Sequence, residues 1–192
     1  MEIERKWLLD INDIPYNLND YEHFDIEQSY ISFHPTIRIR KISNINEYIL
    51  TIKSASKDNG LSRLEYELNI TEKEYEQLLL KKEGITLLKT RYRIPEDKYI
   101  LEIDLFHGEY EGLAYMEVEF NNTDEAKEYV PPKFTRKELT GNPKFTNSAL
   151  VLGKFDINDF WKMYWKKGSI YERKRWCSNE FSKGEWMDWF FS

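Results

Sequence analysis

Much of the chain up to about residue 120 alternates between apolar and charged positions with a period of two, which is typical of β-strands. The alternation is clearest in residues 2–7, 37–40, 50–53, 63–68, 101–105 and 116–120. Side chains at i and i+2 point to the same side of a strand, so each segment presents one charged face and one apolar face. We therefore expect a domain that is mainly β-sheet.

Helical signals are fewer. Thr71–Glu74 has the form of a capping box and predicts a helix after it, with Gly84 placed to end that helix. Short helices are also expected over 123–130, which Pro131 would stop, and over 147–152, with Asn147 as the N-cap. A fourth helix is expected to begin at Asp156 and run toward Lys167.

Residues 155–192 differ from the rest in composition, because they hold five of the six tryptophans among mixed charges. So many indole rings left in water would promote aggregation, so we expect this segment to dock on the main body or on a partner. We divide the chain into a domain over 1–154 and an aromatic-rich appendage of unknown role over 155–192.

Composition narrows the class of protein. The chain has 28 basic and 34 acidic side chains and a formal charge of −6, which argues against indiscriminate binding of nucleic acid or membrane surfaces. No stretch approaches the ~20 apolar residues of a membrane span, and the N-terminus lacks the apolar core of a signal peptide. Because Cys177 is the only cysteine, no intrachain disulfide is possible. We expect a cytoplasmic protein.

The charges on the predicted strands are the most informative feature, because acids and bases occur in i, i+2 pairs. The charged faces together carry eight acids and eight bases: Glu2, Glu4, Lys6, Arg38, Arg40, Lys53, Arg63, Glu65, Glu67, Lys89, Arg91, Arg93, Glu102, Asp104, Glu117 and Glu119. One interpretation is an antiparallel sheet with a solvated, ion-paired face. The other is a closed barrel whose charged alternates line a wet lumen. Such a lumen suits a polyanion bridged by Mg²⁺ or Mn²⁺, since bases bind phosphate oxygens and carboxylates bind hard divalent ions.

Seven segments, in order, resemble the motifs of the CYTH or triphosphate tunnel metalloenzyme superfamily. They are Glu2-Ile3-Glu4-Arg5-Lys6 (ExExK), Thr36-Ile37-Arg38-Ile39-Arg40 (RxR), Leu50-Thr51-Ile52-Lys53 (TxK), Arg63-Leu64-Glu65-Tyr66-Glu67, Lys89-Thr90-Arg91-Tyr92, Leu101-Glu102-Ile103-Asp104 and Glu117-Val118-Glu119. The match covers about residues 1–152 and looks most like the small bacterial tripolyphosphatases. The resemblance implies an α+β fold: an eight-stranded antiparallel β-barrel, or tunnel, with a charged lumen and helices packed outside.

The resemblance also implies roles for individual residues. Metal-binding positions for Mg²⁺ or Mn²⁺ are matched by Glu2, Glu4 and Glu119, with Asp104 and Glu117 as candidates for the same or a second ion. Phosphate-binding positions are matched by Lys6, Arg38, Arg40, Lys53, Lys89 and Arg91. Tunnel-wall positions are matched by Arg63, Glu65 and Glu67, which either bind substrate or orient neighbouring bases, and Arg63 is counted among the substrate-binding candidates. Lys89 is the expected catalytic residue, which positions or activates the attacking water.

The implied reaction is metal-dependent hydrolysis of the terminal phosphoryl bond of tripolyphosphate or a related triphosphate. Two alternatives stay open: a class IV adenylate cyclase, which makes cyclic AMP from ATP, and a non-catalytic polyphosphate- or nucleotide-binding module. The expected partner is a small-molecule triphosphate, with no nucleic acid and no membrane; a homodimer and a tail-mediated partner both stay open. The family often has a Tyr and a basic residue before its C-terminal Asn, where this chain has Phe145-Thr146-Asn147, so the preferred substrate size is open too.

Overall fold

The computed structural model describes residues 2–54 and 62–154, apart from the side chains of Ser62 and Arg63. The predicted helix after Asp156 and the appendage over 155–192 lie outside the described residues, so the division of the chain at 154 stays a prediction. In the described part, no helix is long and apolar enough to cross a membrane.

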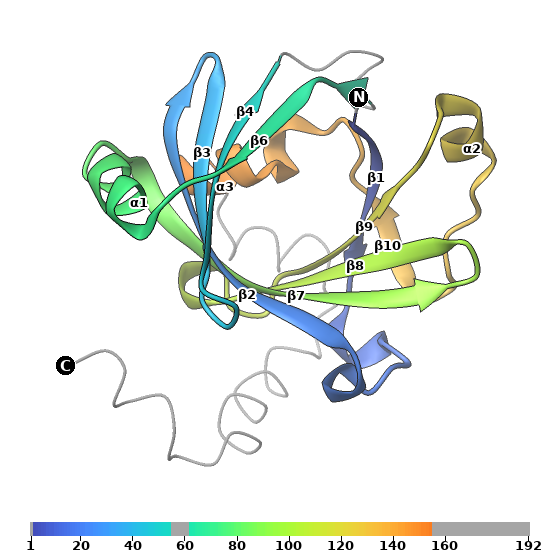
Figure 1. The fold of residues 1–192 in the computed structure, drawn as a ribbon. Coiled ribbons are helices and arrows are strands. Elements are labelled where there is room, and N and C mark those ends of the chain that lie inside the picture. The colour runs from blue at the N-terminus through green and yellow to red at the C-terminus, as the bar shows by residue number, and fades with distance from the viewer. Residues whose placement is uncertain (1, 55–61, 155–192) are drawn as a thin grey trace. The chain divides into compact units, whose positions relative to one another are not determined.

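The domain is built on one curled antiparallel sheet (Figure 1). Its strands are β1 (Glu2–Leu9), β2 (Glu22–Phe33), β3 (Thr36–Ile42), β4 (Glu47–Lys53), β5 (Ser62–Arg63), β6 (Glu65–Asn69), β7 (Glu83–Glu96), β8 (Tyr99–Phe106), β9 (Ala114–Glu119) and β10 (Thr135–Glu138). The order of hydrogen-bonded neighbours is β10-β1-β9-β8-β7-β2-β3-β4-β6. Short 3₁₀ turns at Ile11–Asp13, Leu18–Asp20, Gly108–Tyr110 and Pro143–Phe145 lie in the connections.

The two ends of this sheet are joined through the β5–β6 segment. β6 pairs with β4, whereas β5, two residues earlier, pairs with the beginning of β1. The chain thus passes from one end of the strand order to the other at Leu64, between the two short strands. The sheet has ten strands, and the eight strands that the family resemblance implies are obtained only by counting β5 and β6 as one interrupted segment and leaving the short outer strand β10 aside.

The apolar alternates face away from the interior of the curled sheet, as expected, and helices cover part of that outer face, whereas Ile52, Tyr66 and Leu68 on β4 and β6 stay exposed. Helix α1 (Glu72–Leu79) packs over β3 and β4, where Ile39 and Tyr75 are buried. Helix α2 (Thr123–Glu128) lies against β1, in a larger cluster that buries Trp7 and Met116. In Figure 1 the two helices flank the curled sheet on opposite sides. Burial of the outward face leaves the charged alternates on the inner face.

Three of the four predicted helices lie in the described residues and are confirmed in position, with two corrections in detail. Thr71 and Glu74 form the complete capping box of α1. The third helix, α3 (Asn147–Val151), is capped by Thr146, whose hydroxyl accepts from the Ala149 amide, and not by Asn147.

The second correction concerns Gly84, which does not end α1. This glycine lies in β7 with a φ of +75°, and a Cβ added there would lie 2.4 Å from the Val151 carbonyl oxygen. Only glycine allows both that backbone conformation and the close approach of α3. Gly84 therefore allows α3 to pack closely against β7.

Candidate functional site

The inner face of the sheet encloses a cavity of about 1280 Å³. Each strand from β1 to β9 except β5 contributes to its lining, and α3 adds Asn147, Ser148 and Ala149. Charged residues from the predicted i, i+2 pairs reach it from opposite walls, among them Glu4 and Lys6 of β1. The charged face therefore lines a cavity, which agrees with the barrel interpretation in outline, although the main strand order is that of an open sheet.

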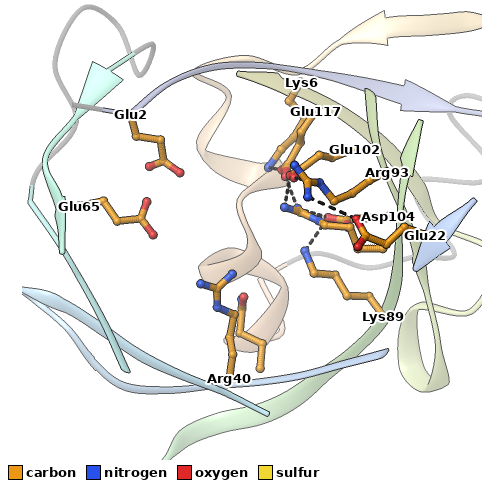
Figure 2. Close-up of polar contacts among 12 residues, drawn as sticks. Glu2, Lys6, Glu22, Arg40, Glu65, Lys89, Arg93, Glu102, Asp104 and Glu117 are labelled. Atoms are coloured by element: carbon orange, nitrogen blue, oxygen red, sulfur yellow. Dashed lines mark hydrogen bonds and ion pairs between the residues drawn. The ribbon is translucent and has the colours of Figure 1, made fainter. Parts of the chain in front are cut away.

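One wall carries a cluster that we call the β8 ion cluster. Its members are Lys6, Lys89, Arg91, Glu102, Asp104 and Glu117. Arg91 is at its centre: Nε lies 2.6 Å from Asp104 Oδ1 and Nη2 lies 2.8 Å from Asp104 Oδ2, a bidentate pair, while the same guanidinium contacts Glu102 and Glu117. Lys6 Nζ lies 2.7 Å from Glu117 Oε1. Figure 2 shows the five side chains of the cluster other than Arg91 converging from β1, β7, β8 and β9: Lys6, Lys89, Glu102, Asp104 and Glu117.

The pKa values of two members of this cluster, Glu117 and Lys89, are shifted by different balances of burial and nearby charge. Burial would raise the pKa of Glu117, but Lys6 and Arg91 outweigh it and hold that pKa well below its usual range. Lys89 shows the opposite balance: burial and the neighbouring Arg91 lower its pKa to about 8, against the pull of Asp104. Lys89 therefore exists partly as a neutral amine near pH 8, as a general base requires.

The facing wall carries the β4 ion cluster, made of Glu2, Arg38, Arg40, Lys53, Glu65 and Glu67. Lys53 Nζ lies 3.0 Å from Glu2 Oε1 and 2.5 Å from Glu65 Oε2. Arg38 Nη2 lies 3.0 Å from Glu65 Oε1, and Arg40 pairs with Glu67. Burial and a hydrogen bond with Glu2 raise the pKa of Glu65 to about 7. The cations of this wall are thus positioned by carboxylates.

Between the two clusters, Glu4 and Glu119 face each other. They are directly opposite in the β1–β9 register, and both line the cavity. Burial raises the pKa of Glu119, and the nearby charges of Glu102, Glu2 and Glu4 raise it further. Carboxylates that raise one another's pKa favour a cation between them, and carboxylate oxygens are the donors that Mg²⁺ and Mn²⁺ prefer. Glu2, Glu4 and Glu119 therefore fit a hard divalent ion in donor type.

The described residues hold no group of three His, Cys, Asp or Glu side chains already arranged around a metal-sized space. Asp104 and Glu117, two further predicted ligands, are engaged with cations. Asp104 is fully buried and does not line the cavity. Glu2 is engaged as well, by the Lys53 ammonium, so pairing with a cation does not separate the candidates; only Asp104 is set apart, by its absence from the cavity lining. The whole ligand set stays a prediction.

The predicted phosphate-binding residues Lys6, Arg38, Arg40, Lys53, Lys89 and Arg91 all line the cavity. Arg63 is the exception, because its side chain lies outside the described set; its backbone pairs with Glu2. The role of Arg63 stays a prediction.

Several lining residues were not among the sequence candidates. Gln28 is buried on β2, donates to Tyr30 Oη at 3.2 Å, and accepts from Arg38 Nη1 at 3.5 Å. Lys144 and Lys154 line the cavity beside α3. The i, i+2 spacing of Gln28 and Tyr30 was a usable signal, whereas the lysines lie in loops that have no such period. The family often has a basic residue just before its C-terminal Asn, and here Lys144, three residues before Asn147, lines the same cavity and supplies a positive charge.

Comparisons with known proteins agree with this geometry. The family model described as the CYTH domain matches residues 1–137. The inorganic triphosphatase of Nitrosomonas europaea is 35% identical over 155 residues, which cover 79% of this chain and 97% of that protein. The inorganic triphosphatase of Acetivibrio thermocellus is 36% identical over 126 residues, which cover 65% of this chain and 78% of that protein.

A solved structure extends the likeness to the fold. The crystal structure of an inorganic triphosphatase superposes with a TM-score of 0.58 at 30% sequence identity, and the match covers 79% of this chain and 95% of that one. The family-model match ends at residue 137, so the cavity-lining residues in and around α3 lie outside it.

Proposed function

The chain belongs to the CYTH domain family, and from that membership and the charged cavity we propose that it hydrolyses the terminal phosphoryl bond of tripolyphosphate or a related triphosphate. The proposed reaction depends on Mg²⁺ or Mn²⁺. The observation that carries the proposal is the enclosed lumen in which cations from two facing walls surround a carboxylate pair.

The chemistry of the lumen fits a short polyphosphate. Tripolyphosphate repels nucleophiles because its oxygens are anionic, so a catalyst must neutralise charge on the substrate and on the leaving pyrophosphate. Arg38, Arg40 and Lys53 on one wall and Lys6 and Arg91 on the other supply donors from both sides. Their carboxylate partners hold them in place before substrate arrives, which lowers the cost of orienting them.

A divalent ion held by Glu2, Glu4 and Glu119 would neutralise phosphate oxygens and lower the pKa of nearby water. The remaining work falls to the protein. Lys89 Nζ, with its pKa lowered to about 8, takes a proton from the attacking water. The new P–O bond forms as the bridging P–O bond breaks, and pyrophosphate leaves with the electron pair. Arg91 stabilises the charge that develops on the leaving group.

The decisive assay is phosphate release by the purified full chain. Tripolyphosphate, ATP and thiamine triphosphate are each tested with Mg²⁺, with Mn²⁺ and with EDTA. We expect phosphate from tripolyphosphate with at least one metal and none with EDTA. Cyclic AMP from ATP would support the cyclase alternative instead, and tight tripolyphosphate binding without turnover under every metal condition would support a binding module.

The metal assignment has its own test. Glu4→Gln keeps the shape of the side chain and removes its charge, so we expect most activity to be lost while the protein still folds. Glu138→Gln is the matched control, because Glu138 pairs with Arg5 away from the cavity lining. A fully active Glu4→Gln protein would refute the ligand assignment.

We further propose a cytoplasmic location, because the single cysteine suits a reducing compartment. A homodimer or a partner bound through residues 155–192 stays a proposal as well. Deleting 155–192 tests the second: if solubility and turnover survive, the segment serves a partner.

A further inference from the structure

Lys53 occupies a position between two carboxylates of different predicted roles. Its Nζ lies 3.0 and 3.1 Å from the two oxygens of Glu2 and 2.5 Å from Glu65 Oε2. The Lys53 side chain is only 4% exposed, so the ammonium has little water to replace these partners. Figure 2 shows the carboxylates of Glu2 and Glu65 pointing toward each other. The three side chains form one compact ionic unit.

The contact with Glu2 conflicts with both proposed roles. Glu2 is proposed to hold the metal ion, and an ammonium on both of its oxygens repels a cation that approaches them. Lys53 is proposed to hold phosphate, and it attracts a phosphate oxygen less strongly while its charge is neutralised by Glu2.

We propose that Lys53 is a positioning residue whose ammonium neutralises Glu2 until the metal ion and the triphosphate bind. We further propose that Glu65 stabilises the Lys53 ammonium when it moves away from Glu2. This inference rests on the proposed function and deepens it. When a divalent ion reaches Glu2, Lys53 loses that partner and its charge becomes available to phosphate. When phosphate draws Lys53 away, Glu2 becomes available to metal. Metal and triphosphate therefore assist each other's binding, and linkage requires the effect to be reciprocal.

Glu65 is suited to its part because it contacts the cations on both sides. It pairs with Lys53 in the β4–β6 register and also accepts from Arg38 Nη2 at 3.0 Å. Without the Glu65 charge, Glu2 would balance a larger share of the Lys53 charge, so Lys53 would oppose metal binding at Glu2 more strongly. Removal of the Lys53 charge and removal of the Glu65 charge should therefore change metal affinity in opposite directions.

The test is Mn²⁺ titration of the substrate-free full chain by calorimetry, with triphosphatase activity measured separately. Lys53→Gln should tighten Mn²⁺ binding by about tenfold, because a buried like charge beside the ligand is removed. Glu65→Gln should weaken it severalfold. In the Lys53→Gln background, Glu65→Gln should have little further effect, since its action runs through Lys53; such non-additivity is what a double-mutant cycle measures.

Matched controls are Lys41→Gln and Glu27→Gln, because Lys41 and Glu27 form an ion pair at 3.6 Å on β3 and β2 and neither lines the cavity. Both should leave Mn²⁺ affinity unchanged. Thermal melts establish that each variant folds, and should Lys53→Gln fail to fold, the direction of the Glu65→Gln effect still decides.

Equal or weaker Mn²⁺ binding by a folded Lys53→Gln protein would overturn the inference. Equal effects of Glu65→Gln in the wild-type and Lys53→Gln backgrounds would also overturn it, because Glu65 would then act on the metal through its own charge and not through Lys53. In those cases an active wild-type enzyme would leave the proposed function intact. A wild-type protein that binds no Mn²⁺ would overturn the inference and the metal site together.

Discussion

Glu4 of β1 and Glu119 of β9 are directly opposite each other in an antiparallel register, on the face that lines the cavity. Like charges in that position destabilise a sheet. A fold under selection for stability alone would place a lysine or a threonine at one of the two sites. The repulsion within this pair agrees with the proposal that the two carboxylates bind a cation.

The first prediction follows from that pair. Glu119→Gln should raise the stability of the metal-free protein by about 0.5 kcal/mol and abolish most activity. Because the pKa of Glu119 is raised, wild-type stability falls as pH rises from the unfolded value near 4.5 through the folded pKa, and the variant should lose this component. Urea unfolding in EDTA at a series of pH values measures both effects. A destabilised variant at neutral pH would contradict the prediction.

The second prediction concerns Lys89. Its pKa is lowered to about 8 by burial and by Arg91, so the neutral amine becomes dominant above pH 8. If Lys89 accepts the proton of the attacking water, kcat should rise with pH through about 8 and then level off. Lys89→Met should remove that limb along with most activity. A wild-type kcat that falls through the same range would instead assign Lys89 to phosphate binding as an ammonium.

Lys89 also makes a stability prediction whose sign is fixed. Its folded pKa lies below the value of 10.5 that the unfolded chain has, so the native state binds fewer protons between pH 8 and 10.5. Stability contributed by this residue therefore rises with pH across that interval, and the penalty of burying its charge is full below pH 8. Because the penalty falls on wild type, its free energy of unfolding relative to that of Lys89→Met should rise from pH 7 to pH 10, and unfolding of both proteins across that range measures the change.

The fourth prediction concerns the buried Asp104. Its carboxylate contacts Lys89 and Arg91, and removing one partner of a buried ion pair leaves uncompensated charge. Asp104→Asn should destabilise the fold by about 3–5 kcal/mol. The comparison is Glu138→Gln, which breaks a partly exposed pair with Arg5 and should cost about 1 kcal/mol or less. Similar losses in chemical denaturation of the two variants would show that the β8 ion cluster contributes no special stability.

The fifth prediction uses two glycines with positive φ. Gly84→Ala should destabilise by about 2 kcal/mol or more, because the added Cβ meets the Val151 carbonyl oxygen and displaces α3. Gly153→Ala is the matched control: φ is +63° but no atom lies within 4 Å of the added Cβ, so only the backbone strain is introduced. Thermal melts of both variants give the difference, and equal melting temperatures would show that α3 is not held by this contact.

The sequence by itself determined which charged side chains share a face of the sheet. Strand parity is a local property, so the i, i+2 spacing of Arg38 and Arg40 or of Glu117 and Glu119 fixed their shared face without any knowledge of the fold. Capping chemistry is equally local, and it located α1 at Thr71. The motif order then indicated the family, which the comparisons confirm.

Only the tertiary structure decided how those charges pair. Lys53 and Glu2 are far apart in the chain, and nothing in either segment says that the two will meet; their contact depends on how β5 and β6 bring β4 next to the beginning of β1. The same holds for the burial of Asp104 under Arg91, and for Gly84, whose requirement comes from a helix that begins more than sixty residues later. The face that a strand residue shares with another depends only on their spacing within one strand. Charge pairing and close packing depend on how distant strands and helices come together in the curled sheet.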